Sequence, residues 1–120
     1  IMAYYEHLKI YKSIYDLILY FYRLSRGFTR EFKYGIGQEI RSLLTELLDQ
    51  MVIANSSDNR TKITILSGAE TLIERIKLKV RLLKDLNAMS AKSYEYFSRK
   101  LIDISKQVSA WKKWAEASRS

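Results

Sequence analysis

The chain has 120 residues, the length of one compact domain, and 48% of them are hydrophobic, which supplies a core and excludes wholesale disorder. It contains no cysteine, no proline and one histidine, so a disulfide scaffold, a thiolate metal site and a cysteine nucleophile are excluded. With 21 Lys and Arg against 13 Asp and Glu, the formal net charge is +8, which favours a polyanion or an acidic protein surface as partner.

The first predicted helix covers residues 5–26 and carries two apolar stripes. The inner stripe has the spacing of one helix face and consists of Ile10, Ile14, Leu17, Phe21 and Leu24. Gly27 follows as the expected C-cap. The second stripe consists of Tyr11, Tyr15, Ile18 and Tyr22. Because a bundle buries about one stripe per helix, we expect the three tyrosines to make an exposed patch and this second stripe to form the interface of a homo-oligomer.

A glycine-rich turn at residues 27–37 precedes the second predicted helix, residues 37–54. The inner face of this helix consists of Ile36, Ile40, Leu43, Leu47, Met51 and Ala54. Residues 55–59 are polar and form the next predicted loop.

The third and fourth helices are predicted at residues 61–86 and 91–117, with Ser90 as the expected N-cap of the fourth. The inner face of the third consists of Leu66, Ala69, Ile73, Ile76, Val80 and Leu83. The inner face of the fourth consists of Tyr94, Phe97, Leu101, Ile104, Val108, Trp111 and Ala115. Four helices of similar length with short connections predict one all-α domain over residues 1–120, an up-down-up-down antiparallel four-helix bundle.

The sequence shows no targeting or membrane segment. Its longest uninterrupted apolar run is residues 17–22, whereas about 20 apolar residues are needed to span a bilayer. We therefore expect a cytoplasmic protein encoded by a bacterium or a phage.

Catalysis has no visible support in the sequence. The Glu-x-x-His pairs of di-iron bundles are missing, and Gly35-x-Gly37 lacks the remainder of a phosphate-binding loop. Glu70 and Glu74 lie one turn apart, but Glu74 also faces Lys77, which favours an ordinary surface ion pair. We predict a protein that is not an enzyme, with no catalytic residue, metal or cofactor.

The charge is distributed unevenly along the chain. Residues 1–59 carry seven basic and seven acidic side chains, whereas residues 60–120 carry fourteen and six. The densest cluster lies in the third predicted helix and consists of Arg75, Lys77, Lys79, Arg81 and Lys84. We identify these five as candidate nucleic-acid-binding residues, because clustered cations release counterions when they contact phosphates. A solvated charged face is the alternative interpretation.

Helical geometry divides this cluster into two flanks of the core stripe. One flank consists of Lys77, Arg81 and Lys84, and the other consists of Arg75 and Lys79. Glu74 and Asp85 lie where they can offset the first flank. No acidic residue lies three or four positions from Arg75 or Lys79, so we expect the second flank to keep its charge.

Most aromatic residues occupy stripe positions, which favours packing in the core or between subunits. Trp114 lies off the main stripe beside Lys112 and Lys113. These three residues form a second, smaller candidate patch, because aromatic and basic side chains together can bind single-stranded nucleic acid.

Three segments in order along the chain resemble motifs of the accessory variability determinant (Avd) proteins. Residues 28–37 (FTREFKYGIG) resemble their F-P-R-x-x-K-F/Y-x-x-G turn, with Thr29 in place of the usual proline. Residues 81–90 resemble their R-L-x-K-D-L segment followed by L/M-S/T. Residues 104–112 resemble their closing I-G-x-x-x-G-G-W-x-K.

The resemblance implies a role in a diversity-generating retroelement. Avd proteins are homopentameric barrels of four-helix bundles with a strongly positive surface and no catalytic site. They partner an error-prone reverse transcriptase and are required for cDNA synthesis and mutagenic retrohoming. We therefore expect a homopentamer that binds the reverse transcriptase and RNA or DNA. Lys77 and Arg81 match basic positions of the third helix in that family.

Two other functions stay open. The first is a protein of the kind encoded in 23S rRNA intervening sequences, or another nucleic-acid-binding bundle without a polymerase partner. Such intervening-sequence proteins usually carry S-I-P-A-N-I-A-E-G in the second helix, and residues 45–54 (TELLDQMVIA) do not match it. The second is a homo-oligomeric bundle whose charge confers solubility alone.

Overall fold

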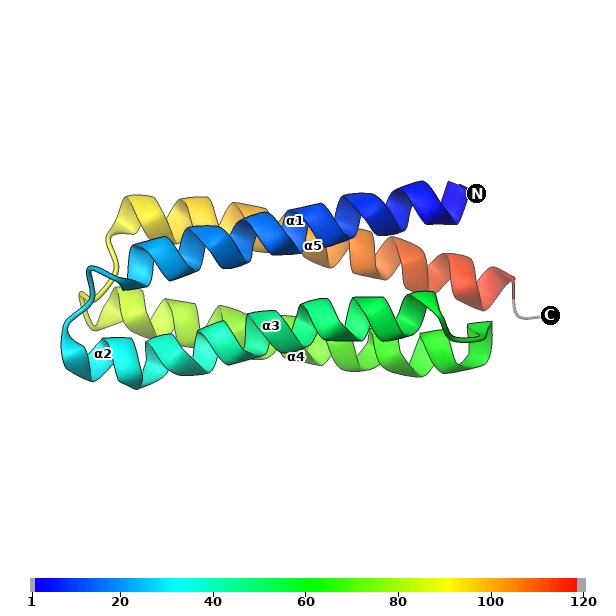
Figure 1. Ribbon diagram of the computed structural model, residues 1–120. Coiled ribbons are helices and arrows are strands. Elements are labelled where there is room, and N and C mark those ends of the chain that lie inside the picture. The colour runs from blue at the N-terminus through cyan, green and yellow to red at the C-terminus, as the bar shows by residue number, and fades with distance from the viewer. Residues whose placement is uncertain (1, 119–120) are drawn as a thin grey trace.

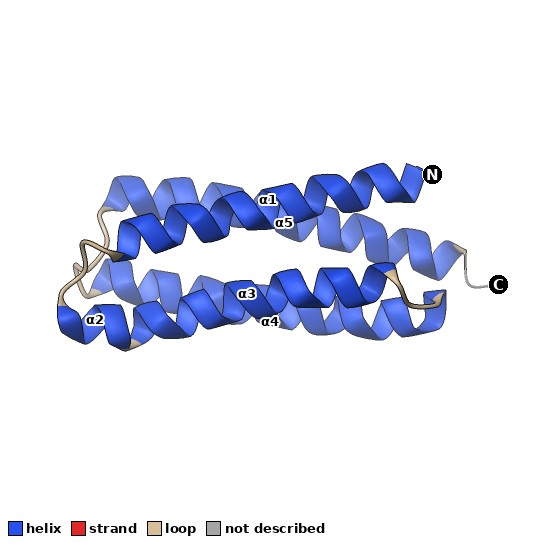
Figure 2. Ribbon diagram, in the orientation of Figure 1, coloured by secondary structure: helices blue, strands red, loops and turns tan. Residues whose placement is uncertain are grey.

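The computed structural model describes residues 2–118, and the side chains of residues 9–118. Its four long helices are α1 (Met2–Ser25), α3 (Ile36–Asn55), α4 (Asn59–Asp85) and α5 (Ala91–Ala117). A short helix, α2 (Arg30–Tyr34), lies between α1 and α3, and none of the described residues forms a strand (Figure 1, Figure 2). The prediction of an all-α four-helix bundle is confirmed, and the predicted helix ends lie within three residues of those observed.

The bundle is a rod of 50 × 20 × 19 Å in which each long helix runs antiparallel to its neighbours (Figure 1). α1 packs against α3 and α5, and α4 packs against the same two helices. One end holds α2 and the α4–α5 turn, and the other holds the α3–α4 turn, the start of α1 and the end of α5 (Figure 1). We divide each long helix near its midpoint. The half that contains α2 and the α4–α5 turn consists of residues 14–45 and 73–104, and we call it the junction half. The other described residues form the terminal half.

The predicted inner faces form the core of the bundle. The predicted core residues that are half-buried rather than buried are Leu24, Ile36 and Tyr94. Phe21 lies in the junction half with its ring centroid 5.9 Å from that of Phe28 and 5.6 Å from that of Phe97, both edge-on. Such edge-on aromatic pairs add about 0.5–1.5 kcal/mol to the stability that area burial provides.

The first turn differs from the prediction in two ways. α1 ends at Ser25, and Gly27 is not a left-handed C-cap, since none of the described glycines has a positive φ. The turn closes instead through hydrogen bonds, in which Gly27 N–H donates to the Leu24 carbonyl (3.2 Å) and Phe28 N–H donates to the Ser25 carbonyl (3.1 Å). In addition, the segment predicted as a turn contains α2.

Two glycines allow the sharp bend between α2 and α3. A Cβ atom on Gly37 would lie 2.6 Å from the carbonyl oxygen of Phe32, and one on Gly35 would lie 2.7 Å from that of Glu31. Both distances are shorter than a side-chain carbon tolerates beside backbone, so the bend requires residues without a Cβ.

Arg41 ties this bend to the rest of the bundle. Its side chain is 7% exposed, and its Nη1 donates to Ser25 Oγ on α1 (2.9 Å). Nη2 donates to the carbonyl oxygen of Lys33 on α2 (2.7 Å) and to Gln38 Oε1 on α3 (2.7 Å). The guanidinium carbon also lies 5.6 Å from the ring centroid of Tyr22. One side chain therefore connects α1, α2 and α3.

Side chains also fix the starts of the last two helices. Asp58 Oδ1 accepts a hydrogen bond from Thr61 N–H (2.8 Å) at the start of α4. Ser90 Oγ accepts one from Ser93 N–H (3.1 Å) at the start of α5, which confirms the predicted N-cap. α4 is closed by Asn87, whose φ of 63° is the left-handed conformation that asparagine tolerates.

Candidate nucleic-acid interface

The candidate cations of α4 lie on two flanks, as helical geometry predicts. Lys77 lines a groove of about 160 Å³ between α4 and α5, and Lys84 Nζ lies 5.2 Å from the ring centroid of Tyr94 on α5. On the opposite flank, Lys79 Nζ lies 2.8 Å from Glu39 Oε1 on α3. The members of the α5 flank are Lys77, Arg81 and Lys84, and those of the α3 flank are Arg75 and Lys79.

Both ion pairs expected on the α5 flank are present. Lys77 Nζ lies 3.0 Å from Glu74 Oε2, and Arg81 Nε lies 3.0 Å from Asp85 Oδ2. The hydrogen bond to Asp85 raises the pKa of the Arg81 guanidinium above its usual value. All four side chains are exposed, and exposed pairs are weak and screened by salt. Lys77 and Arg81 therefore stay available to phosphates, which compete with these carboxylates.

The α3 flank was expected to keep its charge, and this expectation is wrong for Lys79. Within α4, Lys79 has no acidic neighbour, but its ammonium group pairs with Glu39 on α3. Spacing along one helix cannot reveal this partner, because it depends on how two helices pack. Arg75 is exposed and forms no ion pair among the side chains of residues 9–118.

The net charge of the folded chain differs between the two halves of the bundle. The junction half carries 13 basic and 7 acidic side chains, a net charge of +6. The terminal half, over its described side chains, carries seven basic and five acidic ones, a net charge of +2. All five candidate cations of α4 lie in the junction half.

Sequence reasoning missed the cations that the first half of the chain adds to this surface. The basic residues around α2 are Arg23, Arg26, Arg30 and Lys33. The neutral count for residues 1–59 does not reveal them, because that count includes Glu46, Asp49 and Asp58, whose carboxylates lie in the terminal half. The antiparallel order of the helices is the signal that reveals them, since it brings residues 23–33 to the same end as the close of α4.

The tyrosine stripe on α1 is exposed only in part. The Tyr11 hydroxyl donates to the Met51 carbonyl (3.3 Å), and burial raises the pKa of Tyr11 above its usual value. Ile18 packs against the core, whereas Tyr15 is 54% and Tyr22 is 45% exposed. Tyr15 and Tyr22 are therefore exposed as expected, whereas Tyr11 is half-buried. Their role in an oligomer interface stays a prediction.

Two apolar surfaces remain open on the bundle. The first, the tyrosine groove, is a shallow groove of about 480 Å³ between α1 and α3, and its apolar residues are Tyr11, Tyr15, Leu48 and Val52. The second, the leucine ridge, follows the outer face of α4 at one-turn spacing and consists of Leu78, Leu82 and Leu86. Leu78 is 72% exposed. Exposed leucines in a row mark an interaction surface more often than isolated ones do.

The smaller patch near the end of α5 is weakened by an ion pair. Lys112 Nζ lies 3.0 Å from Glu70 Oε1 on α4, and the same carboxylate accepts a hydrogen bond from Ser109 Oγ (3.1 Å). Trp114 is 41% exposed. Of the two lysines expected to attract phosphate there, Lys113 is the one that forms no ion pair among the described side chains.

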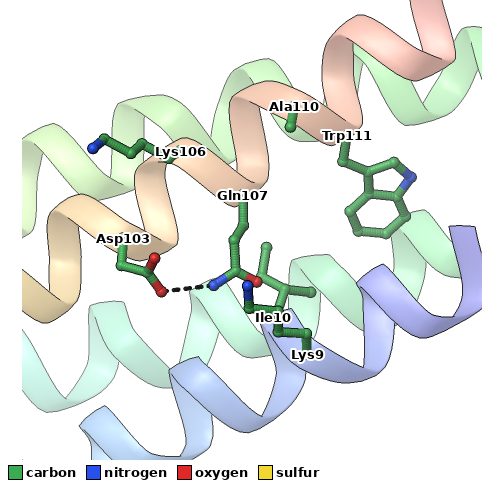
Figure 3. Close-up of a pocket in the computed structure, with 7 residues that line it drawn as sticks. All are labelled: Lys9, Ile10, Asp103, Lys106, Gln107, Ala110 and Trp111. Atoms are coloured by element: carbon green, nitrogen blue, oxygen red, sulfur yellow. Dashed lines mark hydrogen bonds between the residues drawn. The ribbon is translucent and has the colours of Figure 1, made fainter.

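A cavity of about 290 Å³ lies between α1 and α5 in the terminal half (Figure 3). Gln107 Nε2 donates to Asp103 Oδ2 (2.8 Å) and to Ser13 Oγ (3.1 Å) at its edge. Asp103 is the one carboxylate among the described side chains that line the cavity, so these side chains do not form a carboxylate pair. Among the residues that the structure describes, no three His, Cys, Asp or Glu side chains are grouped to hold a metal ion.

None of the helices in residues 2–118 combines the length and the apolarity that a membrane crossing requires. Comparison with curated proteins and with solved structures gives no match. The sequence does match the bAvd-like family over residues 8–115, a span that includes α2, α3 and α4 completely and most of α1 and α5. Because this match covers nearly the whole chain, the protein belongs to the bAvd-like family.

Proposed function

We propose that this protein is a non-catalytic accessory subunit of a diversity-generating retroelement, which binds the error-prone reverse transcriptase and nucleic acid in the cytoplasm. The observation that carries the proposal is the concentration of charge in the junction half of a bundle of the bAvd-like family. A net charge of +6 on one half of a small rod attracts polyanions, and its cations displace condensed counterions from phosphates.

Lys77 and Arg81 are the first residues to test, because both are exposed and lie one turn apart on the same flank of α4. We expect Lys77→Ala with Arg81→Ala to weaken binding to template RNA and to duplex DNA about tenfold, with a shallower salt dependence. Fluorescence anisotropy between 50 and 200 mM salt, about the range over which such contacts weaken, measures both quantities.

The matched control removes two lysines from the terminal half. Lys9→Ala with Lys106→Ala deletes the same number of charges, and neither lysine forms an ion pair among the described side chains. We expect this variant to bind as the wild type does. Equal losses in the two double variants would assign binding to net charge alone, and no loss in a folded Lys77/Arg81 variant would remove these residues from the site.

The polymerase partner separates this function from that of a nucleic-acid-binding bundle that acts alone. We expect the protein to co-purify with a reverse transcriptase encoded beside it, near template and variable repeats. A chain that binds nucleic acid but captures no reverse transcriptase, and that has no such neighbouring gene, belongs to the alternative class.

We extend the proposal to a homopentameric assembly. A closed ring with a heterologous interface needs two different, complementary surfaces on each subunit. The tyrosine groove and the leucine ridge are two apolar surfaces on different helices, which meets this requirement. Light scattering should give five times the chain mass of 14.2 kDa, and Leu78→Glu with Leu82→Glu should give monomers that keep their helical content. A monomeric wild type contradicts the ring.

A further inference from the structure

Tyr34 occupies an unusual position at the tip of the junction half. Its side chain is 66% exposed, more than any other aromatic side chain among residues 9–118, and it lies outside the hydrophobic core. The Arg30 guanidinium carbon lies 6.0 Å from the centroid of its ring, and Lys33 Nζ lies 5.9 Å from it. These distances are at the outer limit of a cation–π contact, so the cations approach the ring without holding it tightly.

The segment that carries Tyr34 is fixed in place. Arg41 Nη2 donates to the carbonyl oxygen of Lys33, and the bend at Gly35 brings the backbone of α2 into close contact with Gly37 of α3. Phe32 is half-buried against the core. A ligand that contacts Tyr34 therefore meets a preorganised ring, and little conformational entropy is lost when it binds.

The charges around this ring favour an anion. Residues 23–41 carry five basic side chains and two acidic ones, and one of the acidic ones, Glu39, is already paired with Lys79. Glu31 is the remaining carboxylate in that segment and is exposed to solvent. The end of the rod also stays open when bundles associate side by side through their long faces.

We infer that Arg30, Lys33 and Tyr34, here called the Tyr34 platform, bind single-stranded nucleic acid. An unpaired base stacks on the Tyr34 ring, and Arg30 and Lys33 contact the adjoining phosphates. A base inside a duplex has no free face to offer, so the platform discriminates single strands from double strands. An acidic polypeptide would satisfy the two cations but would leave the exposed ring without a partner.

This inference rests on the proposed nucleic-acid binding and adds a second contact to it. The cations of α4 attract the phosphates of any strand, because phosphate contacts carry no information about base pairing. The Tyr34 platform adds the preference for unpaired bases. Single-stranded RNA and single-stranded DNA share the stacking chemistry, and both are therefore tested.

The test compares 20-nucleotide oligouridylate, 20-nucleotide oligothymidylate and a 20-base-pair DNA duplex, lengths of about one to five single-strand binding sites, by fluorescence anisotropy. We expect Tyr34→Leu to weaken binding to both single strands about tenfold, since stacking on one aromatic side chain accounts for that much. Binding to the duplex should stay within about twofold of the wild type. Tyr34→Trp, which keeps an aromatic face, should restore single-strand binding.

The matched control is Tyr96→Leu, which removes an exposed aromatic ring that also lies beside a lysine, with Lys100 Nζ 5.4 Å from its centroid, but on the long face of α5. We expect it to leave all three affinities unchanged. Arg30→Ala with Lys33→Ala should weaken single strands and duplex alike, because it removes phosphate contacts. Circular dichroism checks that each variant retains its helical content.

Each outcome has one meaning. Unchanged single-strand binding in Tyr34→Leu overturns this inference alone, and the Lys77/Arg81 variant then still decides the proposed function. Equal losses of single-strand and duplex binding in Tyr34→Leu also overturn it. An equal loss of binding to poly-L-glutamate in the same variant overturns it too, because the ligand would then be an acidic protein. A wild-type protein that binds none of the three probes in 50 mM salt, about the low end of the range over which phosphate contacts weaken, removes nucleic-acid binding altogether.

Discussion

The junction half and the terminal half are built from the same four helices, yet they are held together and charged differently. Each half contains one buried cation that donates to backbone carbonyls. In the junction half Arg41 makes three hydrogen bonds to three helices, whereas in the terminal half Lys62 makes one, to the Ser57 carbonyl (2.6 Å). The half whose buried cation makes more hydrogen bonds is also the half with the net charge of +6.

This difference shows how a small bundle can concentrate charge without losing order. Repulsion among cations destabilises a compact state, so a charged end needs specific contacts to hold it. The close packing of α2 against Gly37 and the guanidinium of Arg41 supply such contacts. In a cyclic ring whose rods lie along the symmetry axis, every junction half faces the same side, and the charges of all subunits add on one rim.

Phe21→Ala gives the largest expected change in stability. The substitution removes a fully buried ring that contacts Phe28 and Phe97, and we expect a loss of about 3–5 kcal/mol in the free energy of unfolding. Urea unfolding followed by circular dichroism measures it. In the terminal half, the volume-conserving Met51→Leu should cost less than about 1.5 kcal/mol. A loss below that value in Phe21→Ala would show that the junction does not depend on this cluster.

Arg41→Met tests the three hydrogen bonds of the Arg41 guanidinium and has the next largest expected effect on stability. The substitution keeps an apolar stem but deprives the Lys33 carbonyl and two other acceptors of their donor, so we expect a loss of about 3 kcal/mol. Lys62→Met is the matched change in the terminal half. Because Lys62 makes one such hydrogen bond, we expect a loss of about 1 kcal/mol in the free energy of unfolding, measured in urea. Equal losses at the two sites would contradict the contrast between the halves.

The sequence predicts the long helices and the core because both depend on spacing within a single segment. The inner face of α4, for example, is buried along its whole predicted length. The close approach of α2 to Gly37, the role of Arg41 and the pairing of Lys79 with Glu39 depend on contacts between segments, which no local pattern contains. For the same reason, the charged half of the bundle is invisible in counts along the chain.

Charge reversal tests the contrast in nucleic-acid binding, with an expected effect of about tenfold, or about 1.4 kcal/mol. Arg26 and Lys92 lie in the junction half outside α4, and both are exposed. Arg26→Glu with Lys92→Glu should weaken duplex binding by that factor in 100 mM salt, an ionic strength at which the Debye length is about 10 Å. The same reversal at Lys9 and Lys106, two exposed lysines of the terminal half, should change it less than about threefold. Reversed ranking would place the binding surface in the terminal half.

Acid gives the smallest expected effect, because it weakens the helix cap of one half and leaves that of the other unchanged. α4 starts in the terminal half at Asp58, and the hydrogen bond from the Thr61 backbone lowers the pKa of this carboxyl below 3.8. A lowered pKa stabilises the fold above pH 3.8, and this contribution is lost as the pH falls through 3.8 and then through the folded-state pKa. α5 starts in the junction half at Ser90, which does not titrate, so its cap persists in acid.

Asp58→Asn separates this cap from the other carboxylates of the chain. Asparagine also accepts the hydrogen bond from Thr61 but carries no charge to lose, so the stability difference between wild type and variant should shrink as the pH falls below 3.8. Ser90→Ala should instead differ from the wild type by the same amount, about 1 kcal/mol, at every pH. Urea unfolding between pH 6 and pH 3, a range that includes the ordinary titration of aspartate, measures both differences. A difference for Asp58→Asn that stays constant over this range would mean that the start of α4 does not depend on the charge of its cap.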